Sequence, residues 1–131
     1  MKTHFKKATI GVMSLEDYKK RTIAIAKGEY KLGKDEPKIW FSSMKSMAHV
    51  LSEENQHLLK LIIEQKPQSV ADLEPLTGRK ANNILRTLRT MERYGFVSLE
   101  ERGTKGRGRK PLVPKVIYDM ADVKLDFSCH F

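Results

Sequence analysis

Asparagine, arginine and lysine are concentrated in residues 79–93 of the sequence. An asparagine amide can form two hydrogen bonds with the edge of adenine, an arginine can form two with guanine, and arginine and lysine both bind phosphate. This combination is typical of a surface that recognises double-stranded DNA. We expect Arg79, Lys80, Asn82, Asn83 and Arg86 to enter the major groove, and Arg89 and Arg93 to lie nearer phosphates.

A second basic stretch, Gly103 to Pro114, contains the segment Gly106-Arg107-Gly108-Arg109-Lys110-Pro111. Its Arg-Gly-Arg centre looks like an AT-hook, in which slim glycines let arginines lie along a narrow A·T-rich minor groove. Gly106 stands where an AT-hook has proline, so a flexible basic loop that contacts phosphates is an equal alternative. The candidate DNA-binding residues of this stretch are Lys105, Arg107, Arg109 and Lys110.

Two predicted helices and a hairpin must position these side chains. Apolar residues at Ala81, Ile84, Leu88 and Met91 predict one buried stripe on a helix over residues 79–94, which Gly95 ends. A short helix precedes it, with a turn at Gly78. Residues 96–102 and 115–120 are predicted to form the two strands of a hairpin, with residues 103–114 at its tip as a wing.

The short helix begins at Ser69, with Asp72 three residues later as in a capping box. Pro75 removes a backbone hydrogen bond, so we expect this helix to be short or kinked. Val70, Leu73 and Leu76 are predicted to face inward. Ser69 and Thr77 stand at helix starts, where hydroxyl or backbone N–H groups can bind phosphates, and both are candidate DNA-binding residues.

Residues 1–51 are predicted to form an N-terminal α/β extension. It comprises strands over 8–13 and 38–41, a helix from Ser14 to about Gly28 and a helix over 43–50 with Met44, Met47 and Ala48 inward. Trp40 and Phe41 are either an exposed anchor for a partner protein or, as we favour, residues that pack the extension onto the rest of the chain.

A helix over 52–65 opens the second segment, residues 52–120, which we interpret as a winged helix-turn-helix domain. Residues 121–131 are a C-terminal tail or an edge strand over 123–127. The predicted fold class is therefore mainly α with a small β-hairpin (α+β).

The distribution of charge supports DNA as the ligand. The net charge is +9, and residues 79–115 carry 11 basic and 3 acidic side chains. Concentrated basicity attracts a polyanion, whereas a merely solvated basic face, the alternative, has no reason to be so uneven. No apolar stretch approaches the length of a membrane span, and a single cysteine agrees with a reducing cytoplasm.

Catalytic and metal-binding functions find little support in the sequence. The four histidines and Cys129 lack metal-ligand spacing, no glycine-rich loop opens a helix after a strand, and the acidic residues are explained by helix caps and surface positions. We therefore expect no enzyme activity, no cofactor and no bound metal.

Several segments together resemble the MarR-like winged helix-turn-helix proteins that are known as predicted transcriptional regulators of bacteria and archaea. The resemblance covers roughly residues 8–120, and Pro75 departs from the family pattern. The matching segments are 26–29, 37–43, 50–52, 66–73, 78–79, 82–88 and 95–97. The resemblance implies a repressor of its own operon and, for many members, an antitoxin whose toxin is encoded by the adjacent gene.

The sequence thus predicts a cytoplasmic, sequence-specific DNA-binding regulator. We expect a homodimer because such proteins usually recognise paired half-sites. Two other functions stay open. One is an antitoxin that binds a toxin through residues 1–51 or the C-terminal tail, which is compatible with DNA binding. The other is a nonspecific architectural nucleic-acid binder that uses the AT-hook-like segment.

Overall fold

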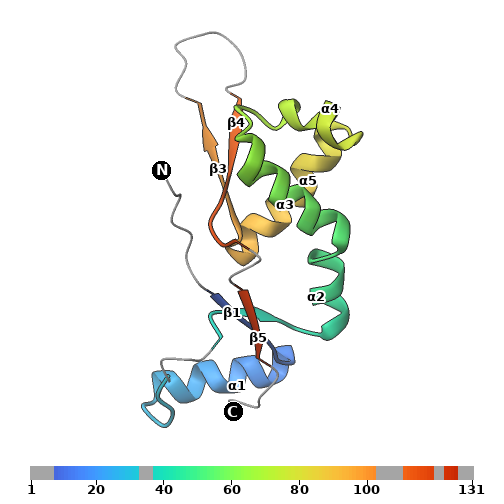
Figure 1. The fold of residues 1–131 in the computed structure, drawn as a ribbon. Coiled ribbons are helices and arrows are strands. Elements are labelled where there is room, and N and C mark those ends of the chain that lie inside the picture. Colours follow the sequence, from blue (N-terminus) through green and yellow to red (C-terminus); the bar gives the residue numbers. More distant parts are fainter. Residues whose placement is uncertain (1–7, 33–36, 103–110, 120–122, 127–131) are drawn as a thin grey trace.

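The computed structural model describes residues 8–32, 37–102, 111–119 and 123–126. These residues form a mixed α and β structure, about half helical, with two small sheets (Figure 1). The elements are β1 (Ala8–Val12), α1 (Leu15–Ala26), β2 (Ile39–Phe41), α2 (Met44–Val50), α3 (Glu53–Gln65), the 3-10 helix η1 (Ala71–Leu73), α4 (Glu74–Thr77), α5 (Ala81–Tyr94), β3 (Val97–Glu101), β4 (Leu112–Val116) and β5 (Val123–Asp126).

The first sheet is parallel and has the strand order β2-β1-β5. Ile10 of β1 lies opposite Ile39 of β2 on one side and Leu125 of β5 on the other. The predicted strand over 123–127 therefore exists as β5, and it extends the N-terminal sheet rather than the hairpin. Residues from both ends of the described chain build this sheet.

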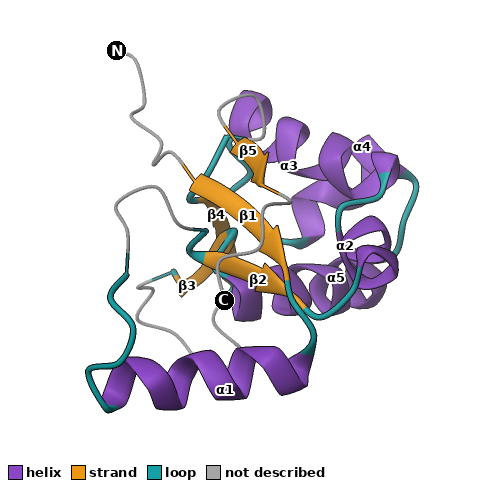
Figure 2. Cartoon of the chain, turned by 90° about the horizontal axis from the view of Figure 1, so that it is seen from below, coloured by secondary structure: helices purple, strands orange, loops and turns teal. Residues whose placement is uncertain are grey.

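The two faces of this sheet have different neighbours. Ile10, Ile39 and Phe41 point to one face and are buried in the same core as the helices from α3 to α5. Helix α1 lies away from those helices, on the other side of the strands (Figures 1 and 2). A parallel sheet is usually covered on both faces, and this arrangement meets that requirement.

Arg21 of α1 fills the space between that helix and the sheet. Its side chain is buried, and its guanidinium carbon lies 5.1 Å from the Trp40 ring centroid and 5.8 Å from that of Tyr30. Gly11 makes this stacking possible, because a Cβ there would lie 2.5 Å from Cζ3 of Trp40 and 2.7 Å from Cγ of Pro37. An arginine over aromatic rings is stabilised by cation–π attraction.

Serine caps begin three of the helices. Ser14, Ser43 and Ser52 each accept a hydrogen bond from the backbone N–H three residues on, at 3.0–3.2 Å. A cap of this kind contributes about 1 kcal/mol to helix stability. The predicted stop at Gly95 is confirmed, since this residue ends α5 with φ +89° in the left-handed region.

The segment before α5 is short, as Pro75 predicts. Ser69 Oγ accepts from Asp72 N at 3.3 Å, while the Asp72 carboxylate accepts from Gln68 N at 3.0 Å rather than from Ser69 N. The helix is split into the 3-10 turn η1 and the four-residue α4, and Pro75 stands in the first turn of α4. Its missing N–H costs nothing there, because the first N–H groups of a helix have no helical partner.

The hairpin of β3 and β4 differs from the predicted one. The prediction of a second strand over 115–120 is wrong, because β4 starts at Leu112 and includes Pro114. Ile117 N donates to Phe96 O at 2.8 Å, and bonded and non-bonded pairs alternate along an antiparallel ladder. Leu99 and Pro114, which lie opposite each other, are therefore a non-bonded pair. Proline is tolerated here since its nitrogen faces away from β3.

One core joins the sheet, the helices and the hairpin. It includes Ile10 and Phe41 from residues 1–51, Leu58 from α3, Leu88 from α5 and Val97 from β3. Residues 1–51 and residues 52–120, which the sequence analysis treats as separate segments, therefore share one apolar core.

Three residues predicted to face inward are exposed instead. Met44 and Leu76 are 52% and 45% exposed, and Ala48 is exposed as well. Helices α2 and α4 are too short to bury a full stripe; α2 contributes Val50 and part of Met47 to the core. No helix within the described ranges is both long and apolar enough to cross a membrane.

Candidate nucleic-acid interface

The predicted buried stripe and its polar opposite are both present on α5. Ile84, Leu88 and Met91 are fully buried, and Ala81, the fourth predicted member of the stripe, is half-buried. Side chains four, three and four residues apart project from the opposite side, because a helix repeats every 3.6 residues. We call this row the basic face of α5; it consists of Asn82, Arg86, Arg89 and Arg93, and all four are exposed. Three guanidiniums and one amide are thus presented by a single rigid element.

Asn82 and Arg86 are the least constrained members of the basic face. Neither side chain makes a hydrogen bond or ion pair within the described part of the chain. An asparagine without internal partners keeps both its carbonyl acceptor and its two amide donors for a ligand. Asn82 therefore retains the full pattern that a bidentate contact with adenine needs.

Arg89 and Arg93 are held by neighbours on the same helix. Arg89 Nη1 lies 3.8 Å from a Glu92 carboxylate oxygen, and Arg93 Nη2 donates to Thr90 Oγ1 at 3.2 Å. Glu92 also accepts a hydrogen bond from Leu99 N at 3.0 Å, which ties α5 to strand β3. The hairpin is thereby fixed beside the basic face.

Arg79 lies just before α5, and its guanidinium is engaged inside the molecule. Its Nε donates to Asn83 Oδ1 at 2.8 Å, Nη2 donates to Thr87 Oγ1 at 2.6 Å, and Nη1 donates to Asn55 Oδ1 at 3.4 Å. Asn55 belongs to α3 and also donates to Val50 O at 2.9 Å. This network connects the start of α5 to α3 and to the end of α2.

The other predicted DNA-binding residues near the turn differ in how many of their polar groups are already hydrogen-bonded within the protein. The prediction that Thr77 stands at a helix start is wrong, because it is the last residue of α4. Its Oγ1 donates to Leu73 O at 2.8 Å and accepts from Arg79 N at 3.1 Å, so its proton is used within the turn. Ser69 is half-buried, and its Oγ accepts a hydrogen bond from Asp72 N. Lys80 is exposed at the N-cap of α5, next to the basic face. Lys105, Arg107, Arg109 and Lys110 lie outside the described residues.

Trp40 and Phe41, the predicted partner-binding residues, serve mainly to pack the chain. Phe41 is fully buried, and its ring stacks on Tyr94 at a centroid distance of 4.3 Å and lies 6.3 Å from Phe96. Phe41 is thus unavailable to a partner, which agrees with the packing interpretation. Trp40 is half-buried against Arg21 and Gly11.

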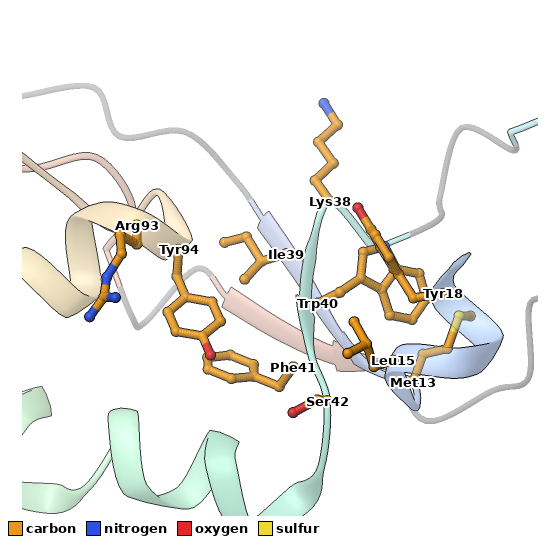
Figure 3. A pocket seen from close by; sticks show the side chains of 10 residues that line it. All are labelled: Met13, Leu15, Tyr18, Lys38, Ile39, Trp40, Phe41, Ser42, Arg93 and Tyr94. Atoms are coloured by element: carbon orange, nitrogen blue, oxygen red, sulfur yellow. The ribbon is translucent and has the colours of Figure 1, made fainter. Parts of the chain in front are cut away.

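A surface recess of about 280 Å³ lies where α1, β2 and α5 meet (Figure 3). Its walls come from Leu15 and Tyr18 on α1, from β2, and from Arg93 and Tyr94 at the end of α5. This recess is apart from the N-terminal half of α5, where Asn82 and Arg86 stand. Within the described ranges, no group of three or more His, Cys, Asp or Glu residues could hold a metal ion.

Sequence reasoning misses three residues of this region: Asn55, Thr87 and Glu92. Arg79, Asn83 and Thr87 are four residues apart, and this spacing is a usable signal, since residues four apart on a helix are neighbours. No such signal exists for Asn55, which is 24 residues from Arg79 in the sequence. Its contact arises only from the folding of α3 against the turn.

Comparison with known proteins gave one positive result. No curated protein and no solved structure matches this chain. A family model named HVO_A0114 matches residues 50–119, more than half of the chain. The matched region runs from the end of α2 to just beyond β4, so it contains the basic face and the hairpin and leaves out β1, α1, β2 and β5. The chain therefore belongs to the HVO_A0114 family.

Proposed function

We propose that this protein is a cytoplasmic, sequence-specific DNA-binding regulator of transcription. In this proposal α3, the segment η1–α4 and α5 form a helix-turn-helix, α5 is the recognition helix, and the β3–β4 hairpin is the wing. The resemblance of the sequence to MarR-like regulators adds the expectation that it represses its own operon.

The observation that carries the proposal is the basic face of α5. Its four exposed side chains, Asn82, Arg86, Arg89 and Arg93, combine base-reading and phosphate-binding groups on one helix opposite a fully buried stripe. A helix fits the major groove when a second element holds it across the phosphate backbone. The contacts of α5 with η1 and with strand β3 support this arrangement (Figure 1).

Replacing Asn82 by Ala is expected to weaken binding to the preferred DNA site by about 1–3 kcal/mol and to relax the preference at one base pair. The physical reason is that, of Asn82 and Asn83, only Asn82 has an amide without hydrogen bonds to other described residues. The preferred site is first selected from a random duplex pool, and binding is then measured on that site and on its single-base variants.

Gln65→Ala is the matched control, since Gln65 is an exposed, uncharged amide on α3 outside the basic face. Equal loss of affinity for every duplex in the Asn82→Ala variant would contradict base reading by this residue. Equal affinity of the wild-type protein for unrelated A·T-rich duplexes would instead favour the architectural function.

We further propose that the regulator is a homodimer and that its outer α1 face forms the interface. Leu15 and Ile23 are 61% and 54% exposed, and Tyr18 is also exposed. Leu15 and Ile23 lie two turns apart on the outer side of α1, with Lys19 between them, and exposed apolar side chains so placed support an interface there. A second copy can cover this face by packing α1 against α1 about a two-fold axis, the commonest symmetry of homodimers.

The double variant Leu15→Lys/Ile23→Lys is expected to be a folded monomer, because burying two lysines in an apolar interface is unfavourable. Light scattering coupled to gel filtration should give twice the mass of one chain for the wild type and one chain mass for the variant. Leu32→Lys, at a residue that is equally exposed but follows α1, should stay dimeric. A dimeric double variant would show that the interface lies elsewhere.

A toxin-binding role is the second candidate, and it would place a toxin, instead of a second copy of the chain, on the α1 face and adjoining recess. Deletion of residues 1–51 would be an uninformative test, since it removes Ile10 and Phe41 from the core. Co-expression of the adjacent gene product with the wild type and with Leu15→Lys/Ile23→Lys is the sharper experiment. A toxin that is retained only by the wild type would support this role.

A further inference from the structure

We propose that Arg79 is a positioning residue, not a DNA ligand, and that it orients Asn83 with its amide donors outward, so that Asn83 recognises guanine. This inference rests on the proposed function. It separates the roles of two adjacent asparagines, Asn82 and Asn83, that are indistinguishable by residue type.

The first step concerns the orientation of the Asn83 amide. Arg79 has only donors, so the atom of Asn83 that lies 2.8 Å from its Nε must be the carbonyl oxygen. The Asn83 amide is thereby turned with Oδ1 toward Arg79 and with both Nδ2 protons toward the opposite side. Asn83 is exposed, so these two donors are accessible to a ligand.

The second step concerns the rigidity of Arg79 itself. Its three guanidinium nitrogens donate to three different residues, and its backbone N–H donates to Thr77 Oγ1 at 3.1 Å. Two of the acceptors, Asn83 and Thr87, lie on α5, and the third, Asn55, lies on α3. A guanidinium with a planar fork suits such fixed, multiple donation, and a lysine ammonium does not reproduce it.

The third step matches the amide to a base. In the major groove guanine presents two adjacent acceptors, N7 and O6, whereas adenine presents the N7 acceptor beside the N6 donor. An amide whose carbonyl oxygen is turned toward Arg79 presents its two donors on the other side, and two donors match the two acceptors of guanine better than the acceptor and donor of adenine. Asn82 keeps donor and acceptor and is complementary to adenine. We therefore expect a guanine at the base pair that Asn83 contacts and an adenine at the one that Asn82 contacts.

The test measures base preference and salt dependence in the same protein samples. Binding to the preferred site and to single-base variants of it is measured for the wild type, Asn83→Ala, Arg79→Ala and Arg79→Lys. We expect about a tenfold loss of discrimination at one guanine in each of the three variants, and no change at the other base pairs. The double variant Arg79→Ala/Asn83→Ala should lose no more discrimination there than either single variant.

Thr87→Val supplies an independent variant. It removes an acceptor of Arg79 without altering any residue of the basic face, and it should reduce preference for the same guanine by a smaller factor. Because discrimination is a ratio of affinities within one sample, it does not depend on the fraction of protein that is folded.

The salt dependence distinguishes positioning from phosphate binding. The slope of log affinity against log salt is negative. If Arg79 neutralised a phosphate, Arg79→Ala would reduce the magnitude of this slope by about 0.9, whereas we expect no change. A slope of smaller magnitude in Arg79→Ala, or full retention of guanine preference in Arg79→Ala and Arg79→Lys, would overturn the inference and leave the proposed function standing. A wild-type protein with no sequence preference at all would overturn both.

Discussion

Replacing Phe41 by Ala is expected to lower the free energy of unfolding by about 3–5 kcal/mol, the usual cost of removing a buried phenylalanine ring. Phe41 has no exposed surface, and it joins β2 to α5 by stacking on Tyr94. Both the lost burial of the ring and the cavity left between sheet and helix contribute. Urea unfolding followed by far-UV circular dichroism measures the change.

Leu125→Ala is the matched control in the same sheet, because Leu125 is about half exposed and its truncation should cost about 0.5 kcal/mol or less. The shape of the Phe41→Ala transition is informative too. One core joins residues 1–51 to the rest, so a single cooperative transition is expected. Two separate transitions, or a loss below 1 kcal/mol, would contradict the view that Phe41 couples the two parts.

The triple variant Arg86→Ala/Arg89→Ala/Arg93→Ala is expected to bind DNA about 1,000-fold less tightly than the wild type. This figure takes about 1.4 kcal/mol for each arginine, within the range of 1–3 kcal/mol typical of such contacts. The magnitude of the slope of log affinity against log salt should also decrease by about 0.9 for every removed arginine that contacts a phosphate. Fluorescence anisotropy titrations between 50 and 200 mM salt, a range over which such contacts are strongly screened, measure both quantities.

The control for the triple variant must remove the same charge elsewhere. Lys20, Lys27 and Lys31 are exposed on α1 or just after it, beyond the sheet from α5. Changing these three lysines to Ala should alter affinity only slightly, because charges farther than a Debye length, about 10 Å at 0.1 M salt, are screened. Equal losses in the two triple variants would mean that overall charge, and not the basic face, determines binding.

The sequence predicts the helical elements well where local chemistry decides them. Serine caps and the stop at Gly95 are signals within a few residues, and the buried stripe on α5 follows from the spacing of Ile84, Leu88 and Met91. The basic face follows from the same helix, since the residues opposite a buried stripe are exposed.

Other features depend on contacts that residue types alone do not reveal. Pro114 is usually read as a strand breaker, and only the register of the hairpin shows that its nitrogen faces outward. Arg79 looks like a DNA ligand from its charge, whereas its partner Asn55 comes from the packing of α3 against the turn before α5. Met44 and Leu76 look like core residues, but their helices are too short to cover them.

The parallel pairing of β5 with β1 has a consequence for biosynthesis. Residues 123–126 leave the ribosome long after residues 8–12, so β1 must wait for its second neighbour until nearly all of the described chain has been made. Pairings between such distant segments form slowly, because a long loop must be closed first. In a nascent chain that has not reached residue 123, one edge of β1 is open to pairing with other chains.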